Sequence, residues 1–222
     1  MSNDVPRKRI RVLLVDDHPV VRKGLSLIIE RESDLTVCGE AEDAPTAILL
    51  TQTRKPNVVI LDISLKGGNG LDLLKDLLAV SPNLAVIVLS IHDENVYAER
   101  ALRAGARGYI MKQEATEKVL TAVRRILTGD ICVSNNIHNR LLRNNGKAKE
   151  TGISPVERLS DRELEVFELI GKGMTTQQIA KHLNLSIKTI ETHNSRIKVK
   201  LGLKNHIELL QHATLWSSKE EK

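Results

Sequence analysis

The chain has 222 residues and little that would mark a secreted, membrane-bound or disulfide-stabilised protein. Its two cysteines, Cys38 and Cys132, are far apart and have no histidine or cysteine neighbours at metal-ligand spacing. We expect reduced core thiols, with a redox pair as the alternative. No apolar run approaches the ~20 residues that a membrane-spanning helix needs. The basic residues 1–11 lack the apolar core of a signal peptide, so we expect a cytoplasmic protein with no membrane partner.

The chain also lacks internal repeats, low-complexity tracts and a glycine-rich phosphate loop after its first strand-like run. The residues at that position are Asp16-Asp17-His18-Pro19. Their identity argues against a dinucleotide-binding domain followed by a protein-interaction tail. The net charge of +5 is uneven, because residues 1–132 are neutral whereas residues 133–157 carry +2 and residues 158–222 carry +3. A basic C-terminal part weakly favours a polyanionic partner.

Residues 10–128 alternate between strand-like and helix-like segments. The strand-like runs are 12–15, 35–41, 58–61, 86–89 and 109–111, and the helix-like segments are 20–30, 45–54, 70–80, 95–104 and 116–128. Continuous runs of valine, isoleucine and leucine are typical of strands buried on both faces of a parallel sheet. Five such units predict an α/β domain with a five-stranded, doubly wound parallel sheet.

Four of the strand-like runs lead into polar residues of catalytic type, which are Asp16-Asp17, Asp62, Ser90 and Lys112. Each alone is more often a cap, a turn or a solvated residue. Together they matter, because the carboxyl ends of parallel strands share one edge of a sheet, where ligands bind. Carboxylates suit Mg²⁺, a central Asp62 can act as a nucleophile, and Ser90 and Lys112 can contact a phosphoryl group. The pattern predicts a magnesium-dependent phosphoryl site.

This arrangement resembles the receiver domain of bacterial response regulators over residues 10–130. The resemblance implies a flavodoxin-like fold in which Asp62 accepts a phosphoryl group from a sensor histidine kinase. It implies that Mg²⁺ is held by Asp16, Asp17, Asp62 and the backbone carbonyl of Ser64, that Ser90 and Tyr109 are the switch pair, with the tyrosine ring turning inward, and that Lys112 pairs with the phosphate. We expect His18 and His92 to be surface residues, because a histidine phosphodonor belongs on a partner.

The loop after Asp62 differs from the family pattern, and the residue two positions after Asp62 bears on an alternative function. The family often has Met-Pro or Leu-Pro shortly after the acceptor, whereas this chain has Leu65-Lys66 followed by Gly67-Gly68-Asn69-Gly70, which should loosen the loop. A magnesium-dependent phosphatase with Asp62 as nucleophile is the alternative from the enzyme class. Such an enzyme would want an acid two residues later, where this chain has Ser64, so we expect no enzyme beyond self-phosphorylation and self-dephosphorylation.

Residues 159–216 predict four helices. Ser160 and Glu163 form a capping box before the first, and the others cover about 176–183, 187–201 and 205–215. On a helical wheel, one face of the third helix carries Ile187, Ile190, Asn194, Ile197 and Leu201. The opposite face carries Lys188, Thr192, Ser195 and Val199, flanked by Glu191 and Arg196. A short turn between the second and third helices predicts a helix-turn-helix, although an ordinary wet face on an amphipathic helix is the alternative.

The same residues resemble the LuxR-type output domain of the NarL/FixJ class of response regulators. The matching run is Leu159-Ser160-Asp161-Arg162-Glu163-Leu164-Glu165-Val166, Gly173, Gln178-Ile179-Ala180, Leu185 to His193 and Lys200-Leu201-Gly202. The resemblance implies contacts with double-stranded DNA, to phosphates from Lys188, Thr189, His193 and Arg196 and to bases from Glu191, Thr192 and Ser195. Glu191 stands where many relatives carry lysine or a neutral residue, and Val199 replaces a commonly basic position. The last helix is a dimer face in the family, or simply closes the four-helix core.

We therefore expect a receiver domain at 8–130, a linker at 131–156 and a LuxR-type DNA-binding domain at 157–217. The linker has a turn-rich, polar sequence with room for a short helix near His138 to Arg143. The whole predicts a two-component transcription regulator that forms a homodimer when phosphorylated or DNA-bound. A regulator that ignores phosphate and binds DNA constitutively stays open.

Overall fold

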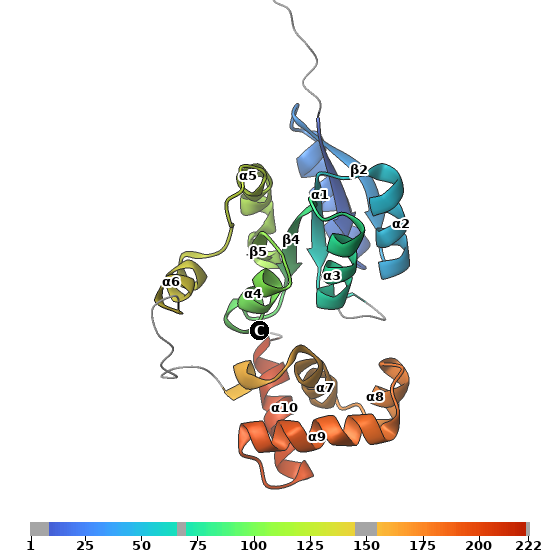
Figure 1. Ribbon diagram of the computed structural model, residues 1–222, viewed down its shortest axis with the longest axis vertical. Coiled ribbons are helices and arrows are strands. Elements are labelled where there is room, and N and C mark those ends of the chain that lie inside the picture. Colours follow the sequence, from blue (N-terminus) through green and yellow to red (C-terminus); the bar gives the residue numbers. More distant parts are fainter. Residues whose placement is uncertain (1–8, 66–69, 145–154, 221–222) are drawn as a thin grey trace, which may run out of the picture. The chain divides into compact units, whose positions relative to one another are not determined.

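The computed structural model describes residues 9–65, 70–144 and 155–220 (Figure 1). They form two compact units, one up to Leu141 and the other from Leu142. The first is α/β and the second is helical, which confirms the predicted fold class. Within the described part of the chain, no helix is both long and apolar enough to cross a bilayer.

The first unit alternates strands and helices in the predicted order. Its elements are β1 (Ile10–Val15), α1 (Pro19–Glu30), β2 (Leu35–Ala41), α2 (Ala44–Arg54), β3 (Val58–Asp62), α3 (Gly70–Val80), β4 (Ala85–Ser90), α4 (Glu94–Arg103), β5 (Gly108–Met111), a 3₁₀ turn η1 (Lys112–Glu114), α5 (Ala115–Leu127) and α6 (Asn135–Asn144). Local chemistry sets several starts: Pro19 occupies the first turn of α1, and the side chain of Asp43 caps α2 by accepting from the Thr46 amide.

The five strands are parallel in the order β2-β1-β3-β4-β5. The chain moves outward from β1 to β2 and then crosses back to β3, so the switch in direction lies between β1 and β3. In a doubly wound sheet this is where a ligand crevice forms, outside the carboxyl ends of the strands. The strand order therefore places the ends of β1 and β3 side by side, with Val15 paired with Leu61.

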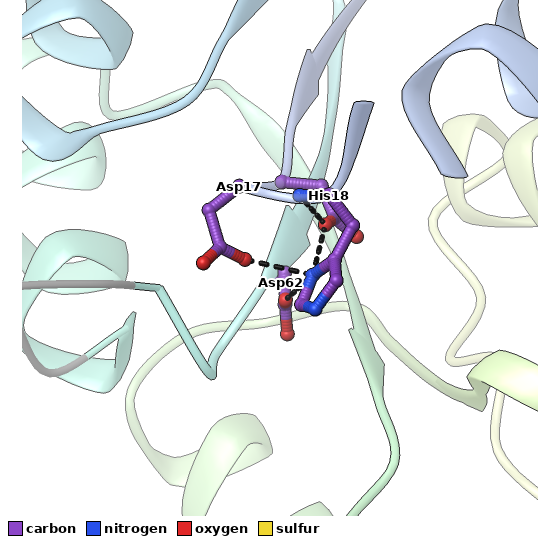
Figure 2. Close-up of side chains that lie close together, drawn as sticks. Asp17, His18 and Asp62 are labelled. Atoms are coloured by element: carbon purple, nitrogen blue, oxygen red, sulfur yellow. Dashed lines mark hydrogen bonds and ion pairs between the residues drawn. The ribbon is translucent and has the colours of Figure 1, made fainter. Parts of the chain in front are cut away.

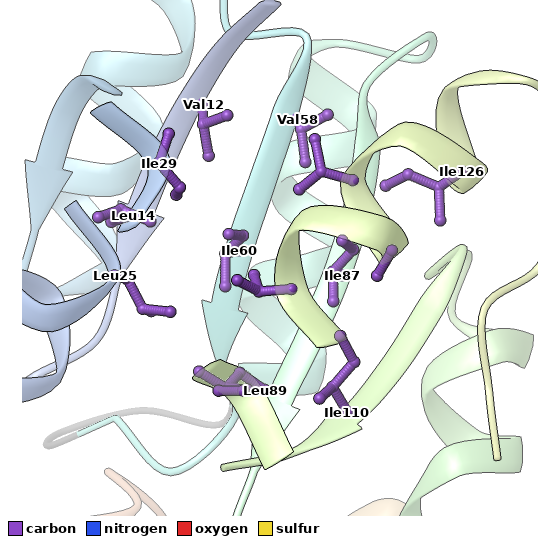
Figure 3. Packing of buried hydrophobic residues seen from close by; sticks show 14 of the residues in the cluster. Val12, Leu14, Leu25, Ile29, Val58, Ile60, Ile87, Leu89, Ile110 and Ile126 are labelled. Atoms are coloured by element: carbon purple, nitrogen blue, oxygen red, sulfur yellow. The ribbon is translucent and has the colours of Figure 1, made fainter. Parts of the chain in front are cut away.

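Alternate side chains of the strands form a core against α1 and α5 (Figure 3). Val12 and Leu14 from β1, Ile60 from β3 and Ile87 from β4 are at most 2% exposed, and the helices add Ile29 and other apolar side chains. In the central strands β3 and β4 the intervening residues are buried on the opposite face, because successive side chains in a strand point to opposite sides. This two-sided burial explains the continuous apolar runs of these two strands, whereas the edge strand β2 is only partly buried.

The two cysteines lie at opposite edges of the sheet. Cys38 is on β2, and Cys132 forms a bridge to Gly108 beyond the edge of β5. With strands spaced ~4.8 Å apart, their Cα atoms are separated by roughly 20 Å or more, far beyond disulfide reach. A redox pair within one chain is therefore excluded. Both thiols are half-buried, and burial raises their pKa, which favours the protonated thiol over the reactive thiolate.

The segment after α5 is attached to the first unit by hydrogen bonds. The Tyr109 amide donates to the carbonyl of Cys132 at 2.9 Å, and the Cys132 amide donates to Arg107 at 2.8 Å. Further along, Ser134 Oγ donates to Glu94 at 2.8 Å, and Arg140 Nη1 donates to the Asn95 carbonyl at 3.0 Å. The first part of the predicted linker thus joins α6 to α4; residues 145–154 of that linker lie outside the described residues. The domain boundaries stay a prediction.

The second unit contains η2 (Pro155–Arg158), α7 (Asp161–Gly171), α8 (Thr176–His182), α9 (Ile187–Leu201) and α10 (His206–Glu220). The turn between α8 and α9 is short because Asn184 adopts a left-handed conformation (φ 52°) and Ser186 caps α9 by accepting from the Thr189 amide. Phe167 of α7 is fully buried and packs on Trp216 of α10, with ring centroids 5.8 Å apart. The predicted helix-turn-helix is present.

Glu163 links the start of α7 to the end of α9. Its Oε2 accepts from the Ser160 amide at 2.8 Å, which completes the capping box, and from Lys200 Nζ at 2.6 Å. The residue is only 3% exposed. Burial would raise the pKa of Glu163, but the bonds from Lys200 and Ser160 outweigh it and hold the pKa below its ordinary value of 4.5.

We expect Glu163→Gln to destabilise the second unit by about 1–3 kcal/mol at neutral pH, because it removes a charged cap and a charge-assisted bond. Since the pKa is lower in the folded state, this stabilisation is present above 4.5 and lost as the pH falls through the folded-state pKa. Urea unfolding followed by Trp216, the single tryptophan, reports this unit in the full chain. Lys200→Met is the partner variant. Additive losses in the double variant would contradict a coupled pair.

Candidate functional site

Three aspartates meet at the switch point of the sheet. Asp16 and Asp17 follow β1 directly, and Asp62 is the last residue of β3. Asp16 is 2% exposed and Asp62 is 1% exposed, and the Asp16 amide donates to the Ala41 carbonyl of β2 at 3.1 Å. Backbone hydrogen bonds between neighbouring strands thus fix the direction in which the carboxylates point. Three buried or half-buried acids in one place repel one another and need a positive partner.

Lys112 supplies that positive charge. It starts η1, immediately after β5, and its side chain reaches past β4 to the first and third strands. Its Nζ lies 2.6 Å from Asp62 Oδ2 and 2.8 Å from Asp16 Oδ2. The lysine side chain is only 12% exposed, so both ion pairs are shielded from water. One ammonium therefore joins residues that are 50 and 96 positions away in sequence.

Burial raises the pKa of Asp62 above its ordinary value of 3.8, and the bonds from Lys112 and the Ser64 amide offset this only in part. Burial would lower the pKa of Lys112, but its bonds to Asp16 and Asp62 raise it above its ordinary value of 10.5. Burial therefore acts against the negative charge of Asp62, whereas the Lys112 ammonium 2.6 Å away favours that charge. The carboxylate that the sequence predicts as a nucleophile is thus poorly hydrated and held by a single ammonium.

His18 also enters the acidic cluster. Its Nδ1 is 2.8 Å from Asp17 Oδ1 and 3.0 Å from Asp16 Oδ1, and Figure 2 shows the ring turned toward Asp17 and Asp62. The ring is 59% exposed, so it is a surface residue, but one that contacts the site. The sequence predicted His18 as a surface residue and gave it no contact with the site. Its position directly after the two predicted metal ligands, Asp16 and Asp17, is the signal that could have indicated this contact.

One ligand atom from each of Asp16, Asp17, His18 and Asp62 lies within 4.8 Å of the others. Three of them are carboxylate oxygens, the donors that Mg²⁺ prefers. The donor set therefore fits a divalent cation. The Ser64 amide donates to Asp62 Oδ1 at 2.9 Å, so the chain turns back toward the Asp62 carboxylate directly after β3.

The loop after Asp62 is closed by a tight contact. A Cβ on Gly70 would lie 2.3 Å from Ile63 Cα, so only glycine permits this approach of α3 to the end of β3. The predicted loosening through Lys66 to Asn69 lies outside the described residues. Within the described part, Leu65 is buried.

Ser90 and Tyr109, the predicted switch pair, meet at the backbone of His92. Ser90 Oγ accepts from the His92 amide at 2.9 Å, and Tyr109 Oη donates to the His92 carbonyl at 2.9 Å. Both residues are buried, so the tyrosine ring already lies inward. The His92 ring stacks on Tyr97 of α4 with centroids 4.8 Å apart. His92, expected to be a surface residue, is half-buried and joins both residues to α4.

The exposed face of α9 carries most of the residues predicted to contact DNA, namely Lys188, Glu191, Thr192, Ser195 and Arg196. Thr189 and His193 are half-buried instead. The Thr189 hydroxyl lies 2.8 Å from Ser186 Oγ at the helix cap, and burial lowers the pKa of His193. Ile190, Asn194 and Ile197 are buried as the helical wheel predicts, whereas Ile187 is 45% exposed.

A switch-point acidic cluster paired with a lysine defines a receiver-type domain, and it precedes a helix-turn-helix unit. Residues 12–124 match the family model described as response regulator receiver domain, and residues 157–213 match bacterial regulatory proteins, luxR family. The chain belongs to the response regulators of the NarL/FixJ class.

Relatives and solved structures agree with this membership. The chain is 34% identical over 209 residues to the oxygen regulatory protein NreC of Staphylococcus carnosus, which covers 92% of this chain and 96% of NreC; NreC of Staphylococcus aureus gives the same values. It is similar to RcsB of Salmonella enterica serovar Typhimurium bound to promoter P1flhDC, with 30% identity, a TM-score of 0.72 and coverage of 93% and 98%. A LuxR-family regulator from Aurantimonas covers 63% of this chain and all of its own, at 29% identity and a TM-score of 0.58.

We expect Asp62→Asn to stabilise the first unit by about 1–2 kcal/mol in urea unfolding, because the raised pKa of Asp62 means that its ionised carboxylate disfavours the fold above that pKa.

We expect Lys112→Met to lower the stability of the first unit by about 3–5 kcal/mol, since two buried carboxylates lose their ammonium partner. Tyr97 and Tyr109, the only tyrosines, report this unit by near-ultraviolet circular dichroism during urea unfolding. Lys118→Met, an exposed pair with Glu114, is the control and should change little. A stability gain with Lys112→Met would contradict the role of this pair.

Proposed function

We propose that this response regulator is a DNA-binding transcription factor switched by Mg²⁺-dependent phosphorylation of Asp62 by a sensor histidine kinase. The observation that carries the proposal is the buried Asp62 carboxylate, held 2.6 Å from Lys112 beside Asp16 and Asp17. An acceptor, a countercharge and a set of cation ligands in one crevice suit phosphoryl capture. A cytoplasmic location is part of the proposal.

In the proposed reaction, an Asp62 oxygen attacks the phosphorus of a phosphohistidine, the P–N bond breaks and an acyl phosphate forms. Asp16, Asp17, Asp62 and the Ser64 carbonyl would hold the Mg²⁺, which would supply positive charge to the transferred group when bound. Lys112 exchanges its pairing with Asp62 for the new phosphoryl oxygens. Ser64 stands where a phosphatase would want an acid, so the acyl phosphate is stored rather than turned over, and the regulator catalyses only its own phosphorylation and dephosphorylation.

A short chain of contacts connects the proposed phosphoryl group on Asp62 to α4. Ser90 is buried at the end of β4, next to β3, and its hydroxyl is free to exchange the His92 amide for a phosphoryl oxygen. That exchange would release His92, which also bonds Tyr109 and stacks on Tyr97. From α4, Glu94 and Asn95 bond to Ser134 and Arg140. The change would then reach α6, the helix inside the predicted linker.

The output is proposed to be duplex DNA. The exposed basic and small polar side chains of α9 suit insertion into a major groove, with Lys188 and Arg196 on phosphates. The names of the similar structures describe RcsB bound to promoter DNA and as dimers on DNA. On α10 of this chain, Ile207, Leu210 and Leu215 are 67%, 41% and 65% exposed while Leu209 and Ala213 are buried. The helix thus closes the core and also offers an apolar face for a homodimer in the phosphorylated or DNA-bound state.

We expect Asp62→Asn to abolish incorporation of labelled phosphate from a small phosphodonor in the presence of Mg²⁺, because the nucleophilic oxygen is gone. Asp72→Asn, on the exposed start of α3, is the matched control and should label normally. Beryllofluoride, a phosphoryl mimic, should raise DNA affinity of the wild type but not of Asp62→Asn. Equal labelling of Asp62→Asn would refute the assignment, and a mimic without effect on affinity would favour the constitutive alternative.

We expect Glu191 to select cytosine at one position of the operator, because a carboxylate accepts from the N4 amino group. Glu191→Gln should change the preferred base toward adenine, with discrimination of about 1–3 kcal/mol, in selection from a randomised duplex library. Val199→Lys is the control: Val199 is 82% exposed, and the new charge should raise affinity for all sequences and steepen the salt dependence by about one phosphate contact. An unchanged base preference in Glu191→Gln would remove Glu191 from base recognition.

A further inference from the structure

His18 contacts the acidic cluster through both its backbone amide and its imidazole ring. Its backbone amide donates to Asp16 Oδ1 at 2.8 Å, and its ring Nδ1 lies 3.0 Å from the same oxygen. The ring Nδ1 is also 2.8 Å from Asp17 Oδ1 and 4.0 Å from Asp62 Oδ2 (Figure 2). The nitrogen thus faces all three carboxylates, and the exposed ring leaves the approach from solvent open.

These separations are those of ligands around a single octahedral ion. With metal–ligand distances of 2.0–2.1 Å, neighbouring ligands stand about 3 Å apart and opposite ligands about 4 Å apart. Nδ1 matches the first spacing toward Asp16 and Asp17 and the second toward Asp62. The two shorter separations are also hydrogen-bond distances, whereas the 4.0 Å approach to Asp62 is not required of a histidine that pairs only with Asp16 and Asp17.

We propose that His18 is a ligand of the divalent cation through Nδ1, so that this site prefers a transition metal such as Mn²⁺ to Mg²⁺. Imidazole nitrogen binds first-row transition metals well, whereas Mg²⁺ favours oxygen donors alone. The mixed set of three carboxylate oxygens and one nitrogen therefore adds affinity for Mn²⁺ that Mg²⁺ does not share. This inference rests on the proposed cation site but goes beyond it in the donor set and the metal.

The opposing interpretation makes His18 a competitor of the metal. A ring that bonds to Asp16 and Asp17 would have to leave before a cation could enter, and its removal would then strengthen binding. The two interpretations predict opposite signs for the same substitution. A spectroscopic signal from the nitrogen also separates them without any variant.

The test uses the full chain with no phosphodonor. Mn²⁺ binding is titrated by electron paramagnetic resonance, Mg²⁺ binding is measured by competition, and electron spin-echo envelope modulation detects a ¹⁴N nucleus bonded to Mn²⁺. We expect ¹⁴N modulation in the wild type and its loss in His18→Ala. Mn²⁺ affinity should fall about tenfold in His18→Ala and Mg²⁺ affinity less than twofold. His138→Ala, an exposed histidine on α6, is the control and should keep the wild-type signal and affinities.

Wild-type protein that binds Mn²⁺ without ¹⁴N modulation would overturn the inference and leave the proposed oxygen-ligand site intact. A rise in Mn²⁺ affinity in His18→Ala would also overturn it in favour of competition. If the wild type bound neither Mn²⁺ nor Mg²⁺, the cation site of the proposed function would fail as well. The wild-type signal alone decides the ligand role, so the outcome does not depend on how well the variant folds.

Discussion

The buried contact of Lys112 with Asp62 and Asp16 is the interaction on which the site depends. Two carboxylates with almost no exposure cannot stay ionised without a partner, and one ammonium from the far side of β4 supplies it. The pairing holds the ends of β1, β3 and β5 in a fixed arrangement. In the proposed function it is also the contact that a phosphoryl group would replace, so phosphorylation would break the ion pair that holds the site together.

Around this pair, the chain couples the crevice to its surface through few contacts. The backbone of His92 accepts one hydrogen bond from Tyr109 and donates one to Ser90, while its ring stacks on Tyr97 of α4. Helix α4 in turn bonds to α6, and Cys132 extends the edge of the sheet beside β5. A continuous series of contacts therefore connects Ser90 through His92 and α4 to α6. In the second unit, Glu163 and Lys200 fix α9 against α7, so the outward face of α9 is presented by a rigid helix.

The secondary structure and most of the site residues were predictable, because they follow from patterns within a few residues of the sequence. The apolar runs predicted the five strands, and glycine, proline and capping residues set the helix ends within one or two positions, apart from α6, which starts at Asn135, and α10, which runs on to Glu220. The strand ends also predicted that Asp16, Asp17, Asp62 and Lys112 would meet, since parallel strands share an edge. His18 was missed for the opposite reason: a residue just after two acids belongs to the site or to solvent depending on its rotamer. The half-burial of Thr189 and His193 likewise follows from packing in the helical unit.

The sequence by itself determined the two units, the strands and helices, and the set of acidic, basic and hydroxyl residues at the strand ends. Periodicity and capping act over a few residues, so they can be found without the fold. Only the tertiary structure decided that β1 and β3 are neighbours, that Lys112 bonds to both aspartates, that the cysteines lie at opposite edges and that His18 Nδ1 faces three carboxylates. These are contacts between residues up to about a hundred positions apart, or choices of side-chain rotamer, and both depend on packing that no local pattern encodes.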